Sequence, residues 1–151
     1  MTALVLTHLL LQAGRPSPPG VVAIAPYAIQ VHDRMSEHAK AQADKDILAV
    51  AQYDAMGRSY VGDSGVSRTD PLVSSAFLPF SASWPKTLIL VGTSDQIIDG
   101  SREVEKRLAA LNVPVELVEY TERPHAFWML PQIFPENVQD TVQRMARFLL
   151  D

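Results

Sequence analysis

Short runs of apolar residues alternate along this chain with longer segments of helical periodicity. Three runs, at residues 20–25, 86–91 and 114–120, have the length and aliphatic content of β-strands. The run at 86–91 is uninterrupted and stops at a glycine, which is typical of a strand buried on both faces. The run at 114–120 alternates more between apolar and polar residues, so we expect it nearer an edge of the sheet.

Helical segments separate and flank these strands. One is predicted from a cap at Asp44 or Asp46 to about residue 60, another at 100–111, and a last one begins at Pro135. The alternation predicts an α/β protein with a mostly parallel sheet of about three strands flanked by helices. The residues expected to form apolar faces are Ile47, Val50, Ala51 and Met56 in the first of these helices, and Val138, Val142, Met145, Phe148 and Leu149 in the last.

The most hydrophobic stretch lies at residues 2–13. It is interrupted by His8 and Gln12 and is too short to span a bilayer, so no membrane span is predicted. A signal peptide is an alternative, but the basic residues that open such a segment are missing. We favour a helix that packs against the sheet with little exposure and ends at Gly14.

Length and composition limit the number of domains and the classes of function that the chain can have. The 151 residues predict one domain, 1–151, and the net charge of −4 without a basic cluster argues against nucleic-acid binding. No cysteine is present, which excludes disulfides and Cys-ligated zinc. The group His32, Asp33, Glu37 and His38 lacks the ligand spacing of a metal site, so neither a metal nor a cofactor is predicted. We expect a cytoplasmic protein.

Two polar residues follow successive predicted strands. Asp95 comes just after the strand at 86–91, and His125 follows the strand at 114–120. With the helix between them, these strands form a βαβ unit, whose parallel strands lie roughly 4.8 Å apart and end at the same rim. A carboxylate that accepts from one imidazole nitrogen leaves the other nitrogen free to act as a general base. The neighbouring Phe127 and Trp128 could wall a pocket.

Simpler interpretations stay open for both residues, because an Asp after a strand often forms a turn and a His beside proline is often structural. A catalytic pair would also need a nucleophile. Ser64 lies in Gly-Asp-Ser-Gly-Val, which begins like a nucleophile elbow but has Val66 at its last position, with no strand before it. Ser94 is adjacent to Asp95 and would point elsewhere. Neither serine is predicted to be the nucleophile.

Four segments occur in an order and spacing that resemble the C-terminal half of the hormone-sensitive-lipase-type esterases, the α/β-hydrolase fold-3 group. The resemblance covers essentially the whole chain and implies an incomplete α/β-hydrolase fold and a carboxylic-ester hydrolase. The matching segments are Asp70-Pro71-Leu72-Val73-Ser74, Pro85 to Asp95, Pro114-Val115-Glu116-Leu117, and Pro124-His125-Ala126-Phe127.

By this resemblance, Asp95 corresponds to the acid of a catalytic triad and His125 to its base. Tyr27, directly after the strand at 20–25, would line the substrate pocket together with Phe127 and Trp128. The segment 28–62 would shape that pocket or form a cap over it. The substrate would be a small-molecule ester.

The family's Gly-Asp-Ser-Ala-Gly elbow and His-Gly-Gly-Gly motif have no counterpart in the chain. We therefore expect a truncated hydrolase, inactive in isolation, in which the strand at 20–25 loses its inner neighbour. Such an apolar edge favours self-association. Two alternatives stay open: a non-catalytic remnant that binds a small apolar ligand or a partner chain, and an intact small protein that uses Ser64.

Overall fold

The computed structural model describes residues 2–31 and 35–150. Within them lies a three-stranded parallel sheet in the order β1 (Gly20–Ile24), β2 (Lys86–Gly92) and β3 (Val115–Tyr120). β2 is the central strand and is buried, as its uninterrupted apolar sequence predicts, and β3 lies at an edge. The predicted α/β class, with a parallel sheet of about three strands flanked by helices, is confirmed.

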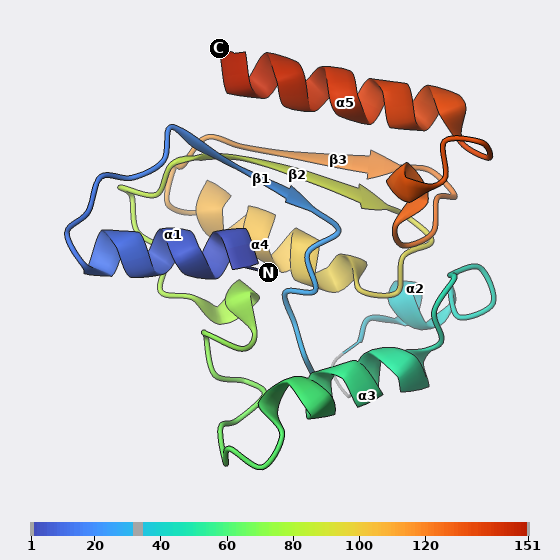
Figure 1. Cartoon of the computed structure of the whole chain (residues 1–151), viewed down its shortest axis with the longest axis horizontal. Helices are drawn as coiled ribbons and strands as arrows, with labels where there is room; N and C mark the ends of the chain where they lie inside the picture. Colours follow the sequence, from blue (N-terminus) through green and yellow to red (C-terminus); the bar gives the residue numbers. More distant parts are fainter. Residues whose placement is uncertain (1, 32–34, 151) are drawn as a thin grey trace.

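Helices cover both faces of this sheet (Figure 1). α5 lies on one face, α1 and α4 lie on the other, and α3 lies further out on the side of α1 and α4. All three strands point toward the same end of the molecule, where α2 and η3 are found. The helices are α1 (Thr2–Gln12), α2 (Glu37–Lys40), α3 (Val50–Val61), α4 (Ile98–Ala109) and α5 (Pro135–Leu150), with short 3₁₀ turns η2 (Ser75–Phe77) and η3 (Phe127–Met129).

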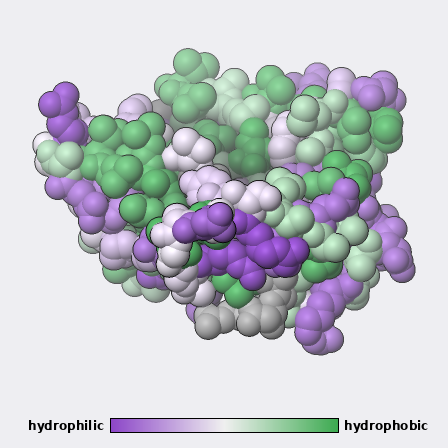
Figure 2. Space-filling model, turned by 60° about the horizontal axis from the view of Figure 1, so that its bottom comes forward, coloured by the Kyte–Doolittle hydropathy of each residue, from purple (hydrophilic) through white to green (hydrophobic). Residues whose placement is uncertain are grey.

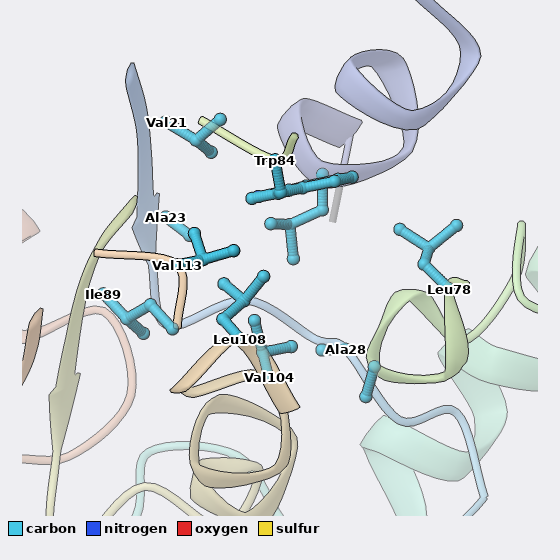
Figure 3. Packing of buried hydrophobic residues seen from close by; sticks show 11 residues of the cluster. Val21, Ala23, Ala28, Leu78, Trp84, Ile89, Val104, Leu108 and Val113 are labelled. Carbon is cyan, nitrogen blue, oxygen red and sulfur yellow. The ribbon is translucent and has the colours of Figure 1, made fainter. Parts of the chain in front are cut away.

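The main core fills the space between the sheet and the helices α1 and α4 (Figure 3). Val21 and Ile89 from the strands meet Val104 and Leu108 of α4, and Trp84 closes this cluster. Because successive side chains of a strand point to opposite faces, Leu88 and its alternate neighbours pack toward α5 instead. Each fully buried aliphatic side chain stabilises the fold by about 1.5–3 kcal/mol.

α1 is less buried than its composition predicts. Leu4 is fully buried, whereas Leu6 is 54% exposed and Leu9 is 43% exposed. The expectation of little exposure is therefore wrong. Only one stripe of the helix faces β1 and the core, and the apolar residues on its other side have no neighbour among the described residues that covers them.

α3 begins at Val50, later than expected, and its cap is Ala49 rather than Asp44 or Asp46. Its buried face is also different, because Ile47 and Met56 are each 52% exposed, while Tyr53 and Gly57 are buried. A Cβ at Gly57 would lie 2.9 Å from Gln30 Oε1 and 3.3 Å from Tyr27 Oη. The glycine therefore lets α3 approach the segment after β1 closely.

α5 also buries fewer residues than its pattern predicts. Met145 and Phe148 pack on the sheet together with Phe134, but Val142 is 54% exposed and Leu149 is 62% exposed. The sheet beneath this 16-residue helix is only three strands wide, so one stripe of the helix finds a partner. The helical period is right, and the width of the apolar face is overestimated.

Candidate active site

The candidate site lies at the rim where the strands end (Figure 1). The loop after β2, the loop after β3 and the segment that leads into α3 come together there. In open parallel sheets this rim, beyond the carboxyl ends of the strands, is where ligands bind. The rim is thus the place to look for chemistry.

Asp95 and His125 are directly hydrogen-bonded. His125 Nδ1 donates to Asp95 Oδ2 over 2.9 Å, and the other carboxylate oxygen of Asp95 accepts from the backbone N–H of Ile97 at 2.9 Å. The carboxylate is fully buried, while the imidazole retains 21% of its exposure. The arrangement fixes the proton on Nδ1 and leaves Nε2 as an acceptor.

Backbone contacts between the two loops set this geometry. Ser94 N donates to Arg123 O at 3.0 Å, and Glu122 N donates to Thr93 Oγ1 at 2.8 Å. Gly92 makes the approach possible, since a Cβ there would lie 1.9 Å from Arg123 O. The glycine that ends the apolar run of β2 is therefore required by the loop that carries His125.

The chain turns sharply directly after His125. Ala126 has a left-handed backbone conformation with φ +55°, which costs a non-glycine residue roughly 1–2 kcal/mol. The turn sends Phe127 into the core and places Trp128 beside the imidazole. The backbone is thus strained at the position next to the candidate base, which is where functional sites tend to hold strain.

Two aromatic rings contact the imidazole edge-on. The ring of Tyr53 lies 5.7 Å from that of His125 at an interplanar angle of 86°, and Trp128 lies at 5.9 Å and 72°. Tyr27 is further along the same stack, 5.7 Å from Tyr53, and its hydroxyl donates to the carbonyl of Tyr53 at 2.7 Å. These rings restrict the rotation of the imidazole.

Charge and burial act in opposite senses on His125. Burial alone would lower its pKa, but the hydrogen bond to Asp95 and the negative charges of Asp95 and Asp46 outweigh it, so the pKa of His125 is raised. Burial raises the pKa of Asp95, and the hydrogen bond from His125 opposes this. The raised pKa of His125 favours the protonated imidazole, because the carboxylate of Asp95 is hydrogen-bonded to the ring and the charge of Asp46 lies nearby.

The three residues expected to line the pocket differ in how deeply they are buried. Phe127 is fully buried and packs on Tyr120 at a ring distance of 4.8 Å, so it belongs to the core and does not wall an open pocket. Its side chain is instead the support on which Trp128 rests, with ring centroids 5.6 Å apart. Trp128 and Tyr27 are partly exposed at the rim.

Ser64 is not part of this arrangement. It lies in an exposed turn just after α3, and α3 carries it away from the rim toward the opposite end of the molecule (Figure 1). Its hydroxyl accepts from the backbone N–H of Val66, as in an ordinary turn. Ser94 is buried and takes part in the loop contacts described above through its backbone.

The candidate metal group falls partly outside the described residues, because His32 and Asp33 are not among them. In the rest of the chain no cluster of three or more His, Cys, Asp or Glu residues could hold a metal ion. Over the same part of the chain, no helix combines the length and apolarity needed to cross a bilayer.

Sequence reasoning missed Asp46, Tyr53 and Gln96. Asp46 was expected to be a helix cap, but its carboxylate binds the backbone of both loops of the site. Gln96 is 1% exposed and donates through Nε2 to the carbonyl of Leu48 at 2.7 Å. The only signal available was the polar sequence around Asp46 just before a helix, and it gives no indication of partners 50 and 79 residues away.

The comparisons with known proteins agree with this geometry. The sequence model of the alpha/beta-hydrolase fold family matches residues 1–129. The chain belongs to the α/β-hydrolase fold-3 family. That assignment covers the esterase and lipase type of hydrolase, in accord with the resemblance given above.

Two curated relatives are esterases or hydrolases by name. The chain is 31% identical over 117 residues to the versiconal hemiacetal acetate esterase of Emericella nidulans, an alignment covering 74% of this chain and 41% of the relative. It is 28% identical over 128 residues to an acetyl-hydrolase of Streptomyces hygroscopicus, covering 85% of this chain and 42% of the relative. The chain thus spans less than half the length of these relatives.

Solved structures show the same partial overlap. A hormone-sensitive lipase from a metagenome library superposes with a TM-score of 0.85 and 25% identity, covering 97% of this chain and 48% of the lipase. EstE7, a homologue from a metagenome library, superposes with a TM-score of 0.81 and 28% identity, covering 95% and 49%. The fold is therefore that of about half of a hydrolase of this family.

Proposed function

We propose that this chain supplies the acid and the base of a serine hydrolase that acts on carboxylic esters. The observation that supports the proposal is the 2.9 Å hydrogen bond between Asp95 and His125 at the carboxyl rim of a sheet of this family. A buried carboxylate hydrogen-bonded to an imidazole, whose second nitrogen makes no hydrogen bond to the described residues, has the chemistry of the acid–base part of a triad. Asp95 orients the base and His125 moves the proton.

The proposed reaction runs in two halves. His125 Nε2 takes the proton of a serine hydroxyl as its oxygen attacks the ester carbonyl, and the negative charge moves to the carbonyl oxygen. The imidazolium then gives that proton to the departing alcohol oxygen, which leaves a serine ester. Water, deprotonated by His125, hydrolyses this ester in the same way. Asp95 remains ionised and stabilises the imidazolium throughout.

The serine and the oxyanion donors are proposed to come from polypeptide that is not among these 151 residues. The sequence contains neither a Gly-x-Ser-x-Gly elbow nor a His-Gly-Gly-Gly motif, and Ser64 lies in an exposed turn at the distant end of α3. Loss of a nucleophile removes most of the rate enhancement of such an enzyme. The isolated chain is accordingly proposed to be inactive toward esters.

The proposed substrate pocket lies between Tyr27 and Trp128, with segment 28–62 shaping it. Trp128 contacts His125 directly, and Tyr27 contacts Tyr53, which in turn contacts His125, so an acyl or alcohol group bound beside Trp128 would lie near the imidazole. Both curated relatives bear names that refer to acetyl groups or acetate. p-Nitrophenyl acetate is therefore a reasonable first substrate.

A chimera tests the proposal. This chain would replace the matching half of the metagenomic hormone-sensitive lipase, which keeps its own serine elbow, and hydrolysis of p-nitrophenyl acetate would be measured. We expect an active chimera that loses activity by about four to six orders of magnitude on His125→Ala. Matched variants at exposed polar positions remote from the rim, such as Gln143→Ala on α5, should retain activity.

Two results would count against the proposal. One is a chimera that is folded by circular dichroism and monodisperse, yet inert. The other is an active chimera in which His125→Ala changes nothing, since a different base would then be at work. The isolated chain, treated with a fluorophosphonate, should remain unlabelled; labelling abolished by Ser64→Ala would revive Ser64 as nucleophile.

A second candidate function is binding of a partner chain, including a second copy of this one, through the β1 side of the molecule. β1 has a strand neighbour only in β2 among the described residues, and a groove between α1 and α3 is lined by Thr2, Val5, Leu6, Leu9 and Tyr60. Figure 2 shows apolar residues gathered in patches on either side of a polar region of one face. Light scattering across a concentration series would detect self-association.

A further inference from the structure

The side chain of Asp46 accepts an unusually large number of hydrogen bonds for a residue in the loop between two helices. It lies in the connection between α2 and α3, and its carboxylate is partly buried at the rim. Oδ1 accepts from the backbone N–H groups of Ile47 at 2.7 Å and His125 at 2.8 Å. Oδ2 accepts from Tyr53 Oη and from the N–H of Gln96, both at 2.9 Å. An ionised carboxylate has about four acceptor sites, so this one is filled.

Two of the four donors belong to the loops of the acid–base pair. The N–H of Gln96 is the peptide group directly after Asp95, and the second donor is the N–H of His125 itself. One carboxylate thus sets the relative positions of two backbone segments that come from different strands. Hydrogen bonds to an ionised acceptor are about twice as strong as neutral ones, so both loops are firmly held.

The same segment also restricts the imidazole ring. Tyr53, whose hydroxyl donates to Asp46, presents its ring edge-on to His125. Gln96 strengthens the attachment, because its Nε2 donates to the carbonyl of Leu48 at 2.7 Å. The backbone of His125, its ring and the residue after Asp95 are therefore all fixed by the eight residues from Asp46 to Tyr53.

We propose that Asp46 is a positioning residue, whose carboxylate holds the amides of Gln96 and His125 so that the Asp95–His125 hydrogen bond forms without substrate. Its importance for catalysis rests on the ester-hydrolase function proposed above, but the hydrogen bond itself does not. Asp46 does not touch the reacting atoms; it acts through the backbone of the two loops. Segment 46–53 then fixes the two loops and the imidazole ring in place.

The test uses the isolated chain and requires no ester. Histidine side chains labelled with ¹⁵N report by NMR which ring nitrogen carries the proton, and His125→Gln identifies the signal of His125 among the four histidines. Hydrogen exchange measures the protection of the amides of Gln96 and His125. The variants are Asp46→Asn, which keeps the size but not the charge, and Asp46→Ala. The control is Asp44→Asn, a matched charge change at an exposed position two residues away.

We expect both Asp46 variants to accelerate amide exchange at Gln96 and His125 by about tenfold or more, as for loss of a hydrogen bond to a charged acceptor. The Nδ1 proton of His125 should exchange faster, and its tautomer should become mixed. Asp44→Asn should match the wild type. If Asp46→Ala unfolds, the isosteric Asp46→Asn decides by the same exchange measurement.

Unchanged exchange and an unchanged His125 tautomer in folded Asp46→Asn would overturn the proposal. So would an equal disturbance in Asp44→Asn, because the effect would then be one of general charge. In the chimera, Asp46→Asn should lower kcat more than it changes KM, as expected for a misplaced base. An inert wild-type chimera would count against the ester-hydrolase function alone, since the NMR result stands without it.

Discussion

The rim and the β1 side of this molecule differ in how many of their polar and apolar groups have a partner among the described residues. At the rim, Asp46 accepts four hydrogen bonds and Asp95 accepts two, and the loops that carry them are joined by backbone contacts. On the other side, β1 has one strand neighbour among the described residues, and α1 exposes Leu6 and Leu9. The hydrogen bond between Asp95 and His125 thus forms within the described residues, whereas the β1 side leaves apolar side chains exposed.

The two edges of the sheet show the same difference. β3 carries Glu116 and Glu119, which pair with Arg144 at 3.1 Å and Arg102 at 2.7 Å. Charges of this kind prevent a strand edge from pairing with another chain. β1 reads Gly-Val-Val-Ala-Ile and carries no charge. β3 therefore carries the charges that protect a strand edge, whereas β1 carries none.

The largest effect is expected from Asp95→Asn, which removes the charge behind the base. In the active chimera kcat should fall by about 10⁴-fold, because an amide in this position favours the wrong imidazole tautomer. The measurement is the steady-state rate of p-nitrophenyl acetate hydrolysis, together with the ¹⁵N NMR tautomer of His125 in the isolated chain.

Thermal unfolding of Asp95→Asn serves as its control, since the fold should survive a change of equal volume. A fully active Asp95→Asn chimera would mean that the rim, although well ordered, is not the working site. The rim and the β1 side would then differ in packing but not in function.

Gly92→Ala tests how rigidly the rim is built. The new methyl group would collide with the backbone of Arg123, which is not the end of a flexible side chain, so the β2 end and the His125 loop must separate. We expect a loss of about 3 kcal/mol or more in the free energy of unfolding, measured with urea, at the upper end of the effect of core overpacking.

Gly14→Ala is the matched control for this change. Nothing lies within 4 Å of a Cβ at Gly14, and its φ of +61° makes the cost one of backbone strain alone, about 1–2 kcal/mol. Equal losses in the two variants would show that the contact between Gly92 and Arg123 is loose, and that the rim is not more tightly built than the rest.

The β1 side is tested by Leu6→Glu combined with Leu9→Glu. If this face binds a second copy, the charged variant should be monomeric at concentrations where light scattering shows the wild type as a larger species, because burying the new carboxylates is unfavourable. Leu149→Glu combined with Leu150→Glu places two such changes on the exposed side of α5, across the sheet, and should leave association unaltered. A wild type that is monomeric throughout would exclude self-association.

The parts of this structure that were predictable are those governed by local pattern. The strand at 86–91 and the helix after it follow from periodicity, and the parallel βαβ unit with the strand at 114–120 follows from their alternation. That unit also indicates which two loops meet, and the structure brings Asp95 within 2.9 Å of His125. The catalytic roles of the two residues remain a proposal.

What the sequence did not reveal depends on contacts between distant segments. Asp46 resembles a helix cap, and only the fold shows that its acceptors serve Gln96 and His125. Phe127 has the character of a pocket wall, but the left-handed turn at Ala126 directs it into the core. The exposure of Leu6 could not be predicted either. Composition predicts that an apolar helix is buried, but it does not indicate which side of the helix packs against a neighbour.

The smallest expected effect is a pH dependence of stability that comes from His125. Its pKa is raised in the folded chain by Asp95 and Asp46 against the effect of burial, so the folded state binds this proton more tightly than the unfolded state does. The resulting stabilisation is complete below the ordinary value of 6.5 and is lost as the pH rises through the folded-state pKa. Burial also raises the pKa of Asp95. The stabilisation that this provides is complete only below the ordinary pKa of 3.8 and is lost as the pH rises above that value.

Urea unfolding of the wild type and of His125→Gln between pH 6 and 9 measures this effect. The wild type should lose stability relative to the variant as the pH rises, by less than about 2 kcal/mol, the scale of one hydrogen bond to a charged group. Asp95→Asn removes the main partner and should flatten the difference. Parallel curves for the wild type and His125→Gln would show that the imidazole gains no net charge stabilisation at the rim. Asp95 would then orient the ring without favouring its charged form, and the contrast with the uncharged β1 side would be one of geometry alone.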